Sequence, residues 1–462
     1  MPRTFKLPHF YHSPVISVVK RARRETDARK RDLSPTLLDF GPVRFKIARH
    51  FGFCYGVENA IEIAYQALAE NPDKRIFLLS EIIHNPHVNE NLKERGVQFL
   101  MDTAGTPLLP FDILMPDDVV IVPAFGTTLE VEQALKARGV TLTAYNTTCP
   151  FVEKVWRRSE EIGKQDYTVV IHGKRYHEET RATFSHAQAG APVVVVRDLS
   201  EAQALAKVIS GEKDTVFFFE KFADRFSPGF DPTVHLKRIG VVNQTTMLAT
   251  ETQSIADLLR EAIRATYGDT SEAHHHDGSD GVTSEQISAH FADTRDTLCY
   301  ATKENQDATL ALIADGGDIA VVVGGYNSSN TSHLVELCQQ RLPTYFIRDA
   351  DELLSPKEIR HLELETKQVK TTKDWLIQKS SQPSVINRQQ NGHQQEGSGS
   401  SETSWFPTTD NPQPTAIPTD IVLTAGASCP DVLLDEVLQK IVGWFPNSRS
   451  VEEVLKSYQH EY

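Results

Sequence analysis

Short runs of apolar residues alternate with longer amphipathic segments along most of the chain. Several of the apolar runs are rich in Val and Ile and are continuous rather than interrupted by polar residues. Such runs are typical of strands buried on both faces of a parallel sheet, with helices between the strands. The pattern therefore predicts an α/β fold. The expected strands are 75–80, 119–123, 168–172, 193–197, 215–219, 240–242, 319–323, 344–347 and 421–424.

Three cysteines mark an internal repeat in this pattern. Cys54, Cys149 and Cys299 each begin a segment with the pattern of a helix, which a strand and then a polar loop follow. A second strand that ends in a polar loop completes each unit. Ligands of open α/β sheets bind beyond the carboxyl ends of the strands, where such loops lie. The repeat predicts three similar α/β domains with mostly parallel sheets, arranged with pseudo-threefold symmetry around a central cavity.

Changes in composition indicate where these units begin and end. The basic N-terminal segment has no apolar stretch of the secretory type, which favours a solvated extension and leaves a transit peptide as the alternative. Two polar segments are predicted to be a flexible insertion at about 268–285, which contains His274, His275 and His276, and a disordered linker at about 378–419. The expected division is an extension at 1–43, domains at 44–148, 149–297 and 298–440, and a helical tail at 441–462.

Composition and charge exclude several classes of protein. The 462 residues are 40% hydrophobic and 24% charged, as in globular proteins, and no apolar run is long enough to span a membrane. The 48 basic and 62 acidic residues give a net charge of −14, which disfavours nucleic acid and anionic membranes as partners. Five scattered cysteines do not make a disulfide scaffold, so a reducing compartment such as the cytoplasm is expected.

The three repeat cysteines are candidate metal ligands. The positive end of a helix is expected to lower the pKa of each thiol, and thiolates suit iron–sulfur clusters or zinc. The sequence has no Cys-x-x-Cys pair, and three ligands from three domains would leave one coordination position open. The alternative is that these cysteines are small buried hydrophobic residues. That alternative is the prediction for Cys338, whereas a role of Cys429 as a fourth ligand stays open.

The polar loops carry hydrogen-bonding side chains, many of them at helix starts. Backbone N–H groups and the helix dipole form an anion site there, which predicts binding of a phosphate or diphosphate with little Lys or Arg. Ordinary N-capping is the alternative for each loop. Glu179 is the candidate proton donor, because burial raises the pKa of a carboxyl group, although Glu178-Glu179 also fits a solvated helix start. The expected pocket residues are His84, His177, Glu179, Gln244, Thr245, Thr246, Ser328, Ser329, Asn330 and Ser428.

Eight short motifs follow one another along the chain. They are Gly52-Phe53-Cys54-Tyr55-Gly56-Val57, Ile83-His84-Asn85, Asn146-Thr147-Thr148-Cys149-Pro150, His177-Glu178-Glu179-Thr180, Gln244-Thr245-Thr246, Cys299-Tyr300-Ala301-Thr302, Asn327-Ser328-Ser329-Asn330 and Thr424-Ala425-Gly426-Ala427-Ser428. In this order they resemble the 4-hydroxy-3-methylbut-2-enyl diphosphate reductase family. The resemblance covers roughly 43–377 and 420–439, apart from the polar segments. The longer branch of plants and cyanobacteria is similar at Ala124-Phe125-Gly126, at His172-Gly173-Lys174 and in having an N-terminal extension.

The resemblance implies an enzyme of the methylerythritol phosphate route to isoprenoids. It implies reduction of 4-hydroxy-3-methylbut-2-enyl diphosphate to isopentenyl and dimethylallyl diphosphate, with loss of the allylic hydroxyl as water. A 4Fe–4S cluster would have three cysteine ligands and one open iron for that hydroxyl. Ferredoxin or flavodoxin would supply the electrons, in the cytoplasm or, with a transit peptide, in the plastid stroma.

The resemblance also implies roles for single residues. Glu179 would give a proton, and Thr245 would lie near the hydroxyl with support from Gln244. Many family members carry a histidine where this chain has Phe125, which cannot hydrogen-bond a diphosphate. The implied cluster ligands are Cys54, Cys149 and Cys299, and the implied diphosphate ligands are His84, His177, Ser328, Asn330 and Ser428.

Proteins of two other classes could use the same three cysteines as ligands. A non-enzymatic iron–sulfur sensor or scaffold would need neither Glu179 nor the polar loops. A zinc hydrolase with Cys and His ligands would contain zinc without iron and sulfide.

Overall fold

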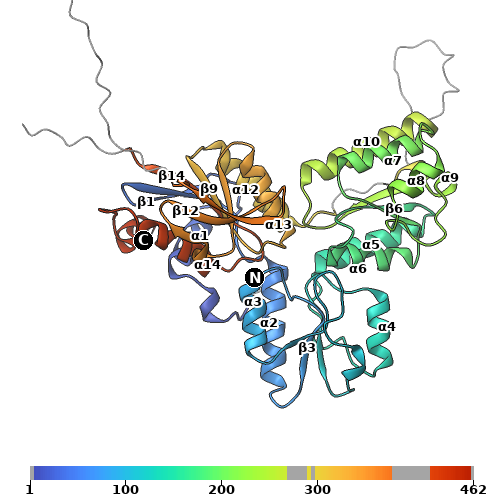
Figure 1. The fold of residues 1–462 in the computed structure, drawn as a ribbon, viewed down its shortest axis with the longest axis horizontal. Helices are drawn as coiled ribbons and strands as arrows, with labels where there is room; N and C mark the ends of the chain where they lie inside the picture. Colours follow the sequence, from blue (N-terminus) through green and yellow to red (C-terminus); the bar gives the residue numbers. More distant parts are fainter. Residues whose placement is uncertain (1–4, 268–288, 293–296, 377–416, 459–462) are drawn as a thin grey trace, which may run out of the picture.

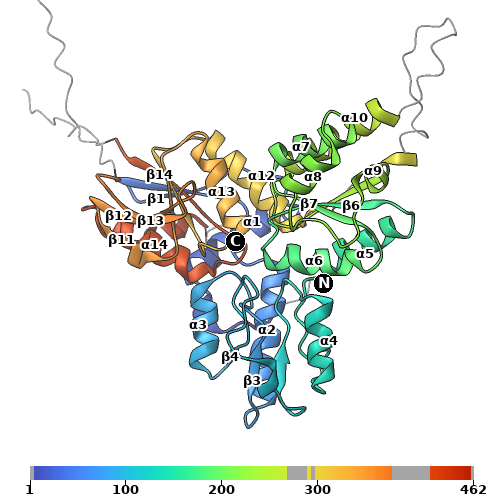
Figure 2. The same ribbon diagram turned by 45° about the vertical axis from the view of Figure 1, so that its right-hand side comes forward.

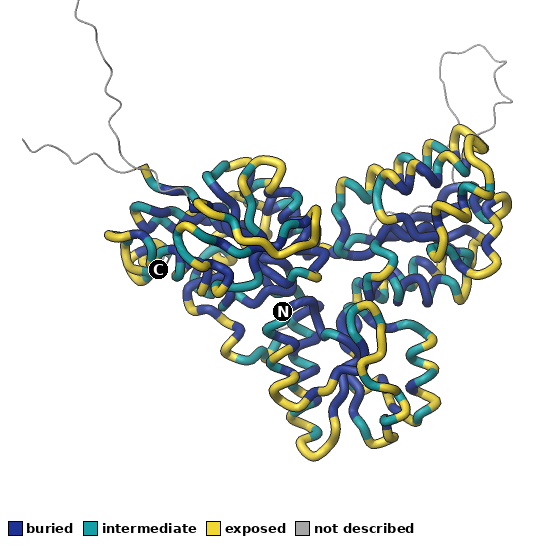
Figure 3. Tube along the Cα trace, viewed as in Figure 1, coloured by how far each residue is buried: buried dark blue, intermediate teal, exposed yellow. Residues whose placement is uncertain are grey.

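The structure is a computed structural model that describes residues 5–267, 289–292, 297–376 and 417–458. Three sheets carry the buried strands, and each sheet forms the middle of one lobe (Figure 1). The lobes meet at a common centre, and the view turned by 45° shows the same arrangement (Figure 2). Within the lobes the strands are largely buried and the outer helix faces are exposed (Figure 3). The predicted α/β class with mostly parallel sheets is confirmed.

The first lobe is built on a three-stranded parallel sheet. Its elements are α2 (Tyr55–Glu70), β3 (Ile76–Leu78), α3 (Pro86–Glu94), β4 (Gln98–Phe99), η2 (Phe111–Ile113), β5 (Val119–Ile121) and α4 (Leu129–Ala137). The strand order is β4-β3-β5. Ile76 and Leu78 pack in one hydrophobic cluster with α2 and α3, whereas Phe77 packs in another with Leu135 of α4. Helices on both faces explain why β3 is apolar at every position.

The second lobe repeats this plan with longer strands. Its elements are α5 (Pro150–Gly163), β6 (Thr168–His172), α6 (Glu178–Gln188), β7 (Val193–Val196), α7 (Leu199–Ile209), α8 (Thr215–Lys221), α9 (Pro232–His235), β8 (Ile239–Asn243) and α10 (Ala249–Tyr267). The parallel order is β7-β6-β8. Val170 packs in the cluster that includes α7 and α10, and its neighbours Val169 and Ile171 pack in the cluster that includes α5 and α6.

The third lobe contains an eight-stranded mixed sheet. Its elements are α1 (Pro14–Thr26), β1 (Thr36–Asp39), β2 (Val43–Ile47), α12 (Tyr300–Ala314), β9 (Ile319–Val323), α13 (Ser329–Gln339), β10 (Thr344–Ile347), η3 (Ala350–Glu352), β11 (Leu353–Ser355), β12 (Glu358–Glu363), β13 (Gln368–Lys373), β14 (Thr419–Ala425), α14 (Asp431–Val442), α15 (Val451–Leu455) and η4 (Lys456–Tyr458), with η1 (His9–Tyr11) before α1. The order is β1-β2-β14-β9-β10-β12-β11, and β13 pairs with β12. The middle pairs are parallel, and the edge pairs are antiparallel.

The N-terminal segment differs from the solvated extension that was expected at 1–43. β2, expected to open the first domain, instead pairs with β14 in the third sheet, and β1 pairs with β2. Helix α1 contacts α14, with Ile16 fully buried and the Ser13 hydroxyl donating to the Asp435 carboxylate at 2.6 Å. The apolar stretch of α1 is short and stands beside many basic residues, so composition alone indicated a solvated segment.

The expected strand at 215–219 is wrong, because these residues form helix α8. The Asp214 side chain caps this helix by accepting a hydrogen bond from the Phe217 N–H. Phe218 is buried while Val216 and Phe219 are exposed, so burial follows one helix face rather than a buried strand. Strand propensity of Val and Phe is thus outweighed by the cap and by packing.

Several sequence features lie outside the described residues. These are the insertion at 268–285 with its three histidines, residues 378–416 of the expected linker, and the first four residues. Within the described residues, no helix has the length and apolar character that crossing a membrane requires.

Candidate active site

The three repeat cysteines face one cavity where the lobes meet. Cys54 is the N-cap of α2, Cys149 of α5 and Cys299 of α12. All three line one cavity, where about 650 Å³ of space, part of it open to solvent, is free of protein atoms. They are close enough for charge on one thiol to affect the others, since Cys54 and Cys299 both raise the pKa of Cys149. The three thiols therefore share one site.

The expected low pKa of these thiols is wrong. Burial raises the pKa of Cys54 and of Cys149 to about 12, and it also raises the pKa of Cys299. N–H groups at the start of α2, from Gly56 and Val57, lower the Cys54 pKa, but burial has the larger effect. A thiolate in this cavity therefore needs a bound cation to stabilise it.

Gly56 allows the Cys149 sulfur to lie against the start of α2. A Cβ atom at this position would lie 2.6 Å from Cys149 Sγ, too close for any side chain. Among the residues that the structure describes, no group of three or more His, Cys, Asp or Glu side chains is arranged to hold a single metal ion.

Glu179 is a buried carboxyl group on the second lobe, in the first turn of α6, and only 1% of the residue is exposed. Burial raises its pKa to about 7. The Thr245 N–H at 2.5 Å and the Thr245 hydroxyl at 3.0 Å donate to its two oxygens and lower the pKa again, by less than burial raises it. Glu179 can therefore hold a proton near neutral pH and release it inside the cavity.

His177 offers an unused hydrogen-bond donor to the cavity. Its Nδ1 accepts a hydrogen bond from the Glu179 N–H at 3.2 Å, so the proton of the neutral ring is on Nε2. Burial holds the pKa of His177 well below its usual value, so the ring is neutral. Nε2 is buried and has no hydrogen-bond partner within the described part of the chain. A ligand with an acceptor oxygen would satisfy this donor.

His84 lies beside His177 and is tied to the second lobe. The ring centroids are 5.0 Å apart with the planes at 84°. Nε2 of His84 lies 2.7 Å from a carboxylate oxygen of Glu178, and the Ser80 hydroxyl donates to the other oxygen of that carboxylate. Glu178 is buried, so the expectation of a solvated helix start is wrong for both acids of this pair.

The third lobe supplies hydroxyl and amide groups from the start of α13. The Ser328 hydroxyl oxygen accepts from the Thr331 N–H and hydroxyl, so its own proton stays available. Asn330 Oδ1 accepts from the Ala427 N–H at 2.8 Å, and Asn330 Nδ2 is buried without a partner among the described residues. Ser329 accepts from Lys174 Nζ at 3.1 Å.

Two expected pocket residues have their side chains engaged elsewhere. Gln244 does not line the cavity, because its amide lies behind the wall and donates to the Thr246 hydroxyl at 2.7 Å. The Ser428 hydroxyl lines the cavity but donates to the His84 carbonyl at 3.1 Å. The predicted residues that do line the cavity are Cys54, His84, Cys149, His177, Glu179, Thr245, Thr246, Cys299, Ser328, Ser329, Asn330 and Ser428.

Phe125 is a wall residue for which the sequence predicted no role. Its ring stacks on the His84 ring with centroids 4.2 Å apart, and it lies 5.7 Å from His177 at a steep angle. The sequence feature that could have indicated this role is the place of Phe125 in a polar loop, between Ala124 and Gly126. Cys338 and Cys429 are fully buried in the core of the third lobe, and neither lines the cavity.

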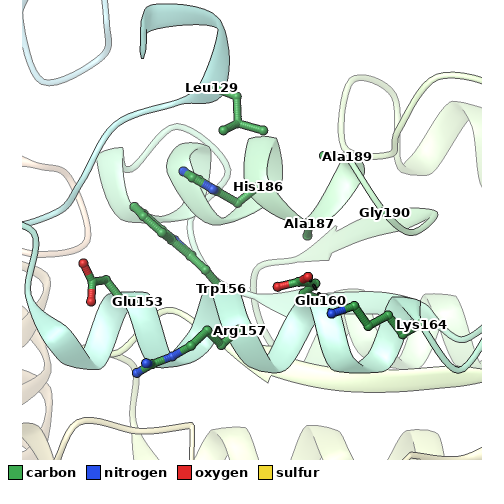
Figure 4. A pocket seen from close by; sticks show the side chains of 10 residues that line it. All are labelled: Leu129, Glu153, Trp156, Arg157, Glu160, Lys164, His186, Ala187, Ala189 and Gly190. Carbon is green, nitrogen blue, oxygen red and sulfur yellow. Dashed lines mark ion pairs between the residues drawn. The ribbon is translucent and has the colours of Figure 1, made fainter. Parts of the chain in front are cut away.

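A second hollow lies away from the thiols, between α4, α5 and α6 (Figure 4). The Trp156 ring stacks on His186 with centroids 3.8 Å apart, and Lys164 pairs with Glu160 at 2.7 Å. None of the expected site residues lines this hollow. The central cavity is therefore the candidate active site.

The comparisons with known proteins agree with one another. The model of the family described as "LytB protein" matches residues 45–442. A protein of Thermosynechococcus vestitus named "4-hydroxy-3-methylbut-2-enyl diphosphate reductase" is 37% identical over 402 residues, which cover 87% of this chain and 85% of that protein. A protein of Crocosphaera subtropica with the same name is 41% identical over 339 residues, 73% of this chain and 78% of that protein.

A solved structure also has a similar fold. The E-1-hydroxy-2-methyl-but-2-enyl-4-diphosphate reductase from Plasmodium falciparum aligns with a TM-score of 0.54 at 17% identity. The alignment covers 87% of this chain and 89% of that one, so the likeness includes all three lobes.

Proposed function

This chain belongs to the LytB protein family, and we propose that it is a 4-hydroxy-3-methylbut-2-enyl diphosphate reductase. The enzyme removes the allylic hydroxyl of its substrate as water and yields isopentenyl and dimethylallyl diphosphate, the last step of the methylerythritol phosphate route. One observation carries the proposal. A single cavity brings together three thiols, a carboxyl group that holds a proton near neutral pH, and buried donors that have no partner in the described part of the chain.

Cys54, Cys149 and Cys299 are the residues that would hold a 4Fe–4S cluster. Three thiols line one cavity, each at the start of a helix from a different part of the chain, and thiolate sulfur is a ligand that suits iron–sulfur clusters. Such a cluster, with one iron free of protein ligands, would supply electrons and a Lewis acid for the substrate hydroxyl.

Glu179 would deliver a proton to the departing hydroxyl. Its carboxyl group lines the cavity, and burial keeps it protonated up to a pH of about 7. Thr245 orients this carboxyl group with two hydrogen bonds and lines the cavity itself, so its side chain would lie near the substrate hydroxyl. Gln244 supports the same loop from behind through Thr246.

The diphosphate would occupy the side of the cavity where donors gather. His177 Nε2–H and Asn330 Nδ2–H have no acceptor among the described residues, and the Ser328 and Ser329 hydroxyl oxygens accept hydrogen bonds, so their protons would be available to a ligand. His84 lines the same wall, Thr246 adds a hydroxyl, and Ser428 would turn its hydroxyl from the His84 carbonyl to the ligand. Within the described residues, no Lys or Arg side chain lines the cavity, so neutral donors do most of the binding.

The reaction consumes two electrons, which an external donor must supply. We infer that a ferredoxin or flavodoxin does so in the cytoplasm, since α1, β1 and β2 of the N-terminal segment pack in the third lobe and do not form a separate transit peptide. Tyr300 follows Cys299 directly and is 41% exposed, so the protein surface comes close to the thiols there.

Anaerobic purification followed by metal analysis and turnover tests the proposal. We expect iron and sulfide in a 4Fe–4S ratio, and reduction of 4-hydroxy-3-methylbut-2-enyl diphosphate with viologen reduced by dithionite. Zinc without iron and sulfide, or a loaded protein without turnover, would contradict it. Glu179→Gln separates an enzyme from an iron–sulfur sensor, since the enzyme should keep its cluster spectrum and lose nearly all turnover.

A further inference from the structure

We propose that Glu178 is a positioning residue that fixes the orientation and the charge of His84, so that His84 binds the diphosphate as a cation. The inference rests on the proposed function and adds a residue that the sequence motifs gave no role. Glu178 lies behind the cavity wall, and it would act on the ligand only through the His84 ring.

The contacts of Glu178 hold its carboxylate in one orientation. One oxygen lies 2.7 Å from His84 Nε2, and the other accepts from the Ser80 hydroxyl. Both side chains of the Glu178–His84 pair are 6% exposed. Ser80 and His84 belong to the loop after β3, whereas Glu178 begins α6, so the pair joins the first and second lobes.

The hydrogen bond between Glu178 and His84 determines which ring nitrogen of His84 is left for a ligand. A carboxylate oxygen only accepts hydrogen bonds, so His84 Nε2 must carry a proton. Nδ1, the other ring nitrogen, has no hydrogen-bond partner among the described residues. In a neutral ring this nitrogen would present a lone pair, which repels phosphate oxygens. In a charged ring it presents a second N–H, which a diphosphate accepts.

Other carboxyl groups lie near the His84 ring. That of Glu81 interacts with the ring in addition to that of Glu178, and that of Glu179 does so when it has lost its proton. The neighbouring ring of His177 is neutral, and the apolar ring of Phe125 covers one face. Within the described chain no Lys or Arg lines the cavity, so a charged His84 ring would place a cation on its wall. Lys174 lies behind the wall and donates to the Ser329 hydroxyl.

Glu178→Gln in the cluster-loaded enzyme tests this role, because it removes the charge and keeps the shape. Relative to wild type at the same pH, we expect KM to rise about tenfold at about pH 8, while kcat changes less than about twofold. The KM ratio should return toward one at about pH 6, because solvent protons then charge His84 without the carboxylate. The inhibition constant of inorganic pyrophosphate should follow the same course.

Asp349→Asn is the matched control. Asp349 forms a similar pair with His87 at 2.9 Å, also between two lobes but outside the cavity. We expect this variant to leave KM and pyrophosphate inhibition unchanged. A similar rise of KM in both variants would mean that Glu178 only holds lobes together, and would overturn the inference.

A KM ratio for Glu178→Gln that stays near one, or that is equally high at both pH values, would also overturn the inference. If this variant does not keep its cluster, Glu178→Asp gives the same test, since it keeps the charge but draws it back from His84. A smaller KM rise that disappears at the lower pH is then expected, and a pH-independent rise contradicts the role. A wild-type protein without turnover and without pyrophosphate binding would instead refute the proposed function.

Discussion

Burial has the largest effect on the protonation of single residues in the cavity, and its sign depends on the type of group. It raises the pKa of the three thiols, raises that of Glu179 to about 7, and lowers that of His177. In each case the neutral form is favoured, as desolvation requires. The three thiols, the Glu179 carboxyl group and the His177 ring are therefore all in their neutral forms just below a pH of about 7.

The raised pKa of Glu179 predicts how activity depends on pH. An acid whose pKa is raised stays protonated up to the raised value, so the proton donor is present below a pH of about 7 and is lost above it. We expect kcat at saturating substrate to fall as the pH rises through this region. Thr245→Val removes a donor to the carboxylate and should move the fall to higher pH, because the ionised form loses a hydrogen bond. A fall near the usual range of Glu would contradict this assignment.

The residue types of the site could be predicted from the sequence, but their pairing could not. The polar loops identified His84, His177 and Glu179 because each follows a strand. Glu178 stands 94 positions from His84, and only the packing of the first lobe on the second brings the two side chains together. The shift of the thiol pKa was predicted in the wrong direction, because the sequence shows that each thiol lies at a helix start but does not show how deeply it is buried.

At the scale of elements, strands buried on both faces were the most predictable. β6, β9 and β10 begin and end where the apolar pattern placed them. The pattern does not specify partners, so the pairing of β2 with β14, across most of the chain, was not foreseen. The prediction of a strand at 215–219 failed because a short apolar run fits a strand or one face of a helix equally well.

The close approach of α2 to α5 makes Gly56 necessary for the cluster site. We expect Gly56→Ala to displace the Cys149 sulfur, since the added Cβ would lie 2.6 Å from it. The iron content per chain, measured after anaerobic reconstitution, should fall to less than about half of wild type. Gly190→Ala is the control, because no atom lies within 4 Å of a Cβ there. Equal iron content in the two variants would show that the site adapts to the extra carbon.

Helix α1 is part of the third core, so its apolar face should contribute to stability. Ile16 is fully buried and packs in the cluster that includes Leu434 and Val437 of α14. Ile16→Ala should destabilise the protein by about 2–5 kcal/mol, the usual cost of truncating a buried Ile. Urea unfolding measures this difference, with the exposed Arg21→Ala on the same helix as control. A loss below about 0.5 kcal/mol would mean that α1 is only loosely attached.

At the scale of the molecule, three lobes share one cavity, and side-chain pairs cross between them. His84–Glu178 joins the first lobe to the second, and His87–Asp349 joins the first to the third. The repeat of cysteines and loops predicted that the lobes converge. It did not predict these links, because a repeat within one chain does not show which side chains of different lobes meet.

The His87–Asp349 pair should give the junction of the first and third lobes a pH-dependent stability. Asp349 raises the pKa of His87 above its ordinary 6.5, and His87 helps to lower the pKa of Asp349 below its ordinary 3.8. A histidine whose pKa is raised on folding stabilises the fold below pH 6.5, and this effect is lost as the pH rises through the raised pKa. An aspartate whose pKa is lowered on folding stabilises the fold above pH 3.8, and this effect is lost as the pH falls through the lowered pKa. Both effects are present between pH 3.8 and pH 6.5, so the pair stabilises the junction most in that range.

Asp349→Asn should lower stability by about 0.5–1 kcal/mol at about pH 6, and by much less at about pH 9, where His87 is neutral. The estimate is small because the His87 side chain is 38% exposed and solvent screens the pair. Thermal unfolding midpoints of variant and wild type at both pH values measure the difference. Glu160→Gln breaks the Lys164–Glu160 pair, in which no histidine takes part, so its effect should be the same at both pH values. An effect of Asp349→Asn that is equal at both would show that the carboxylate stabilises the junction through η3, where it caps the Asp351 N–H, and not through His87.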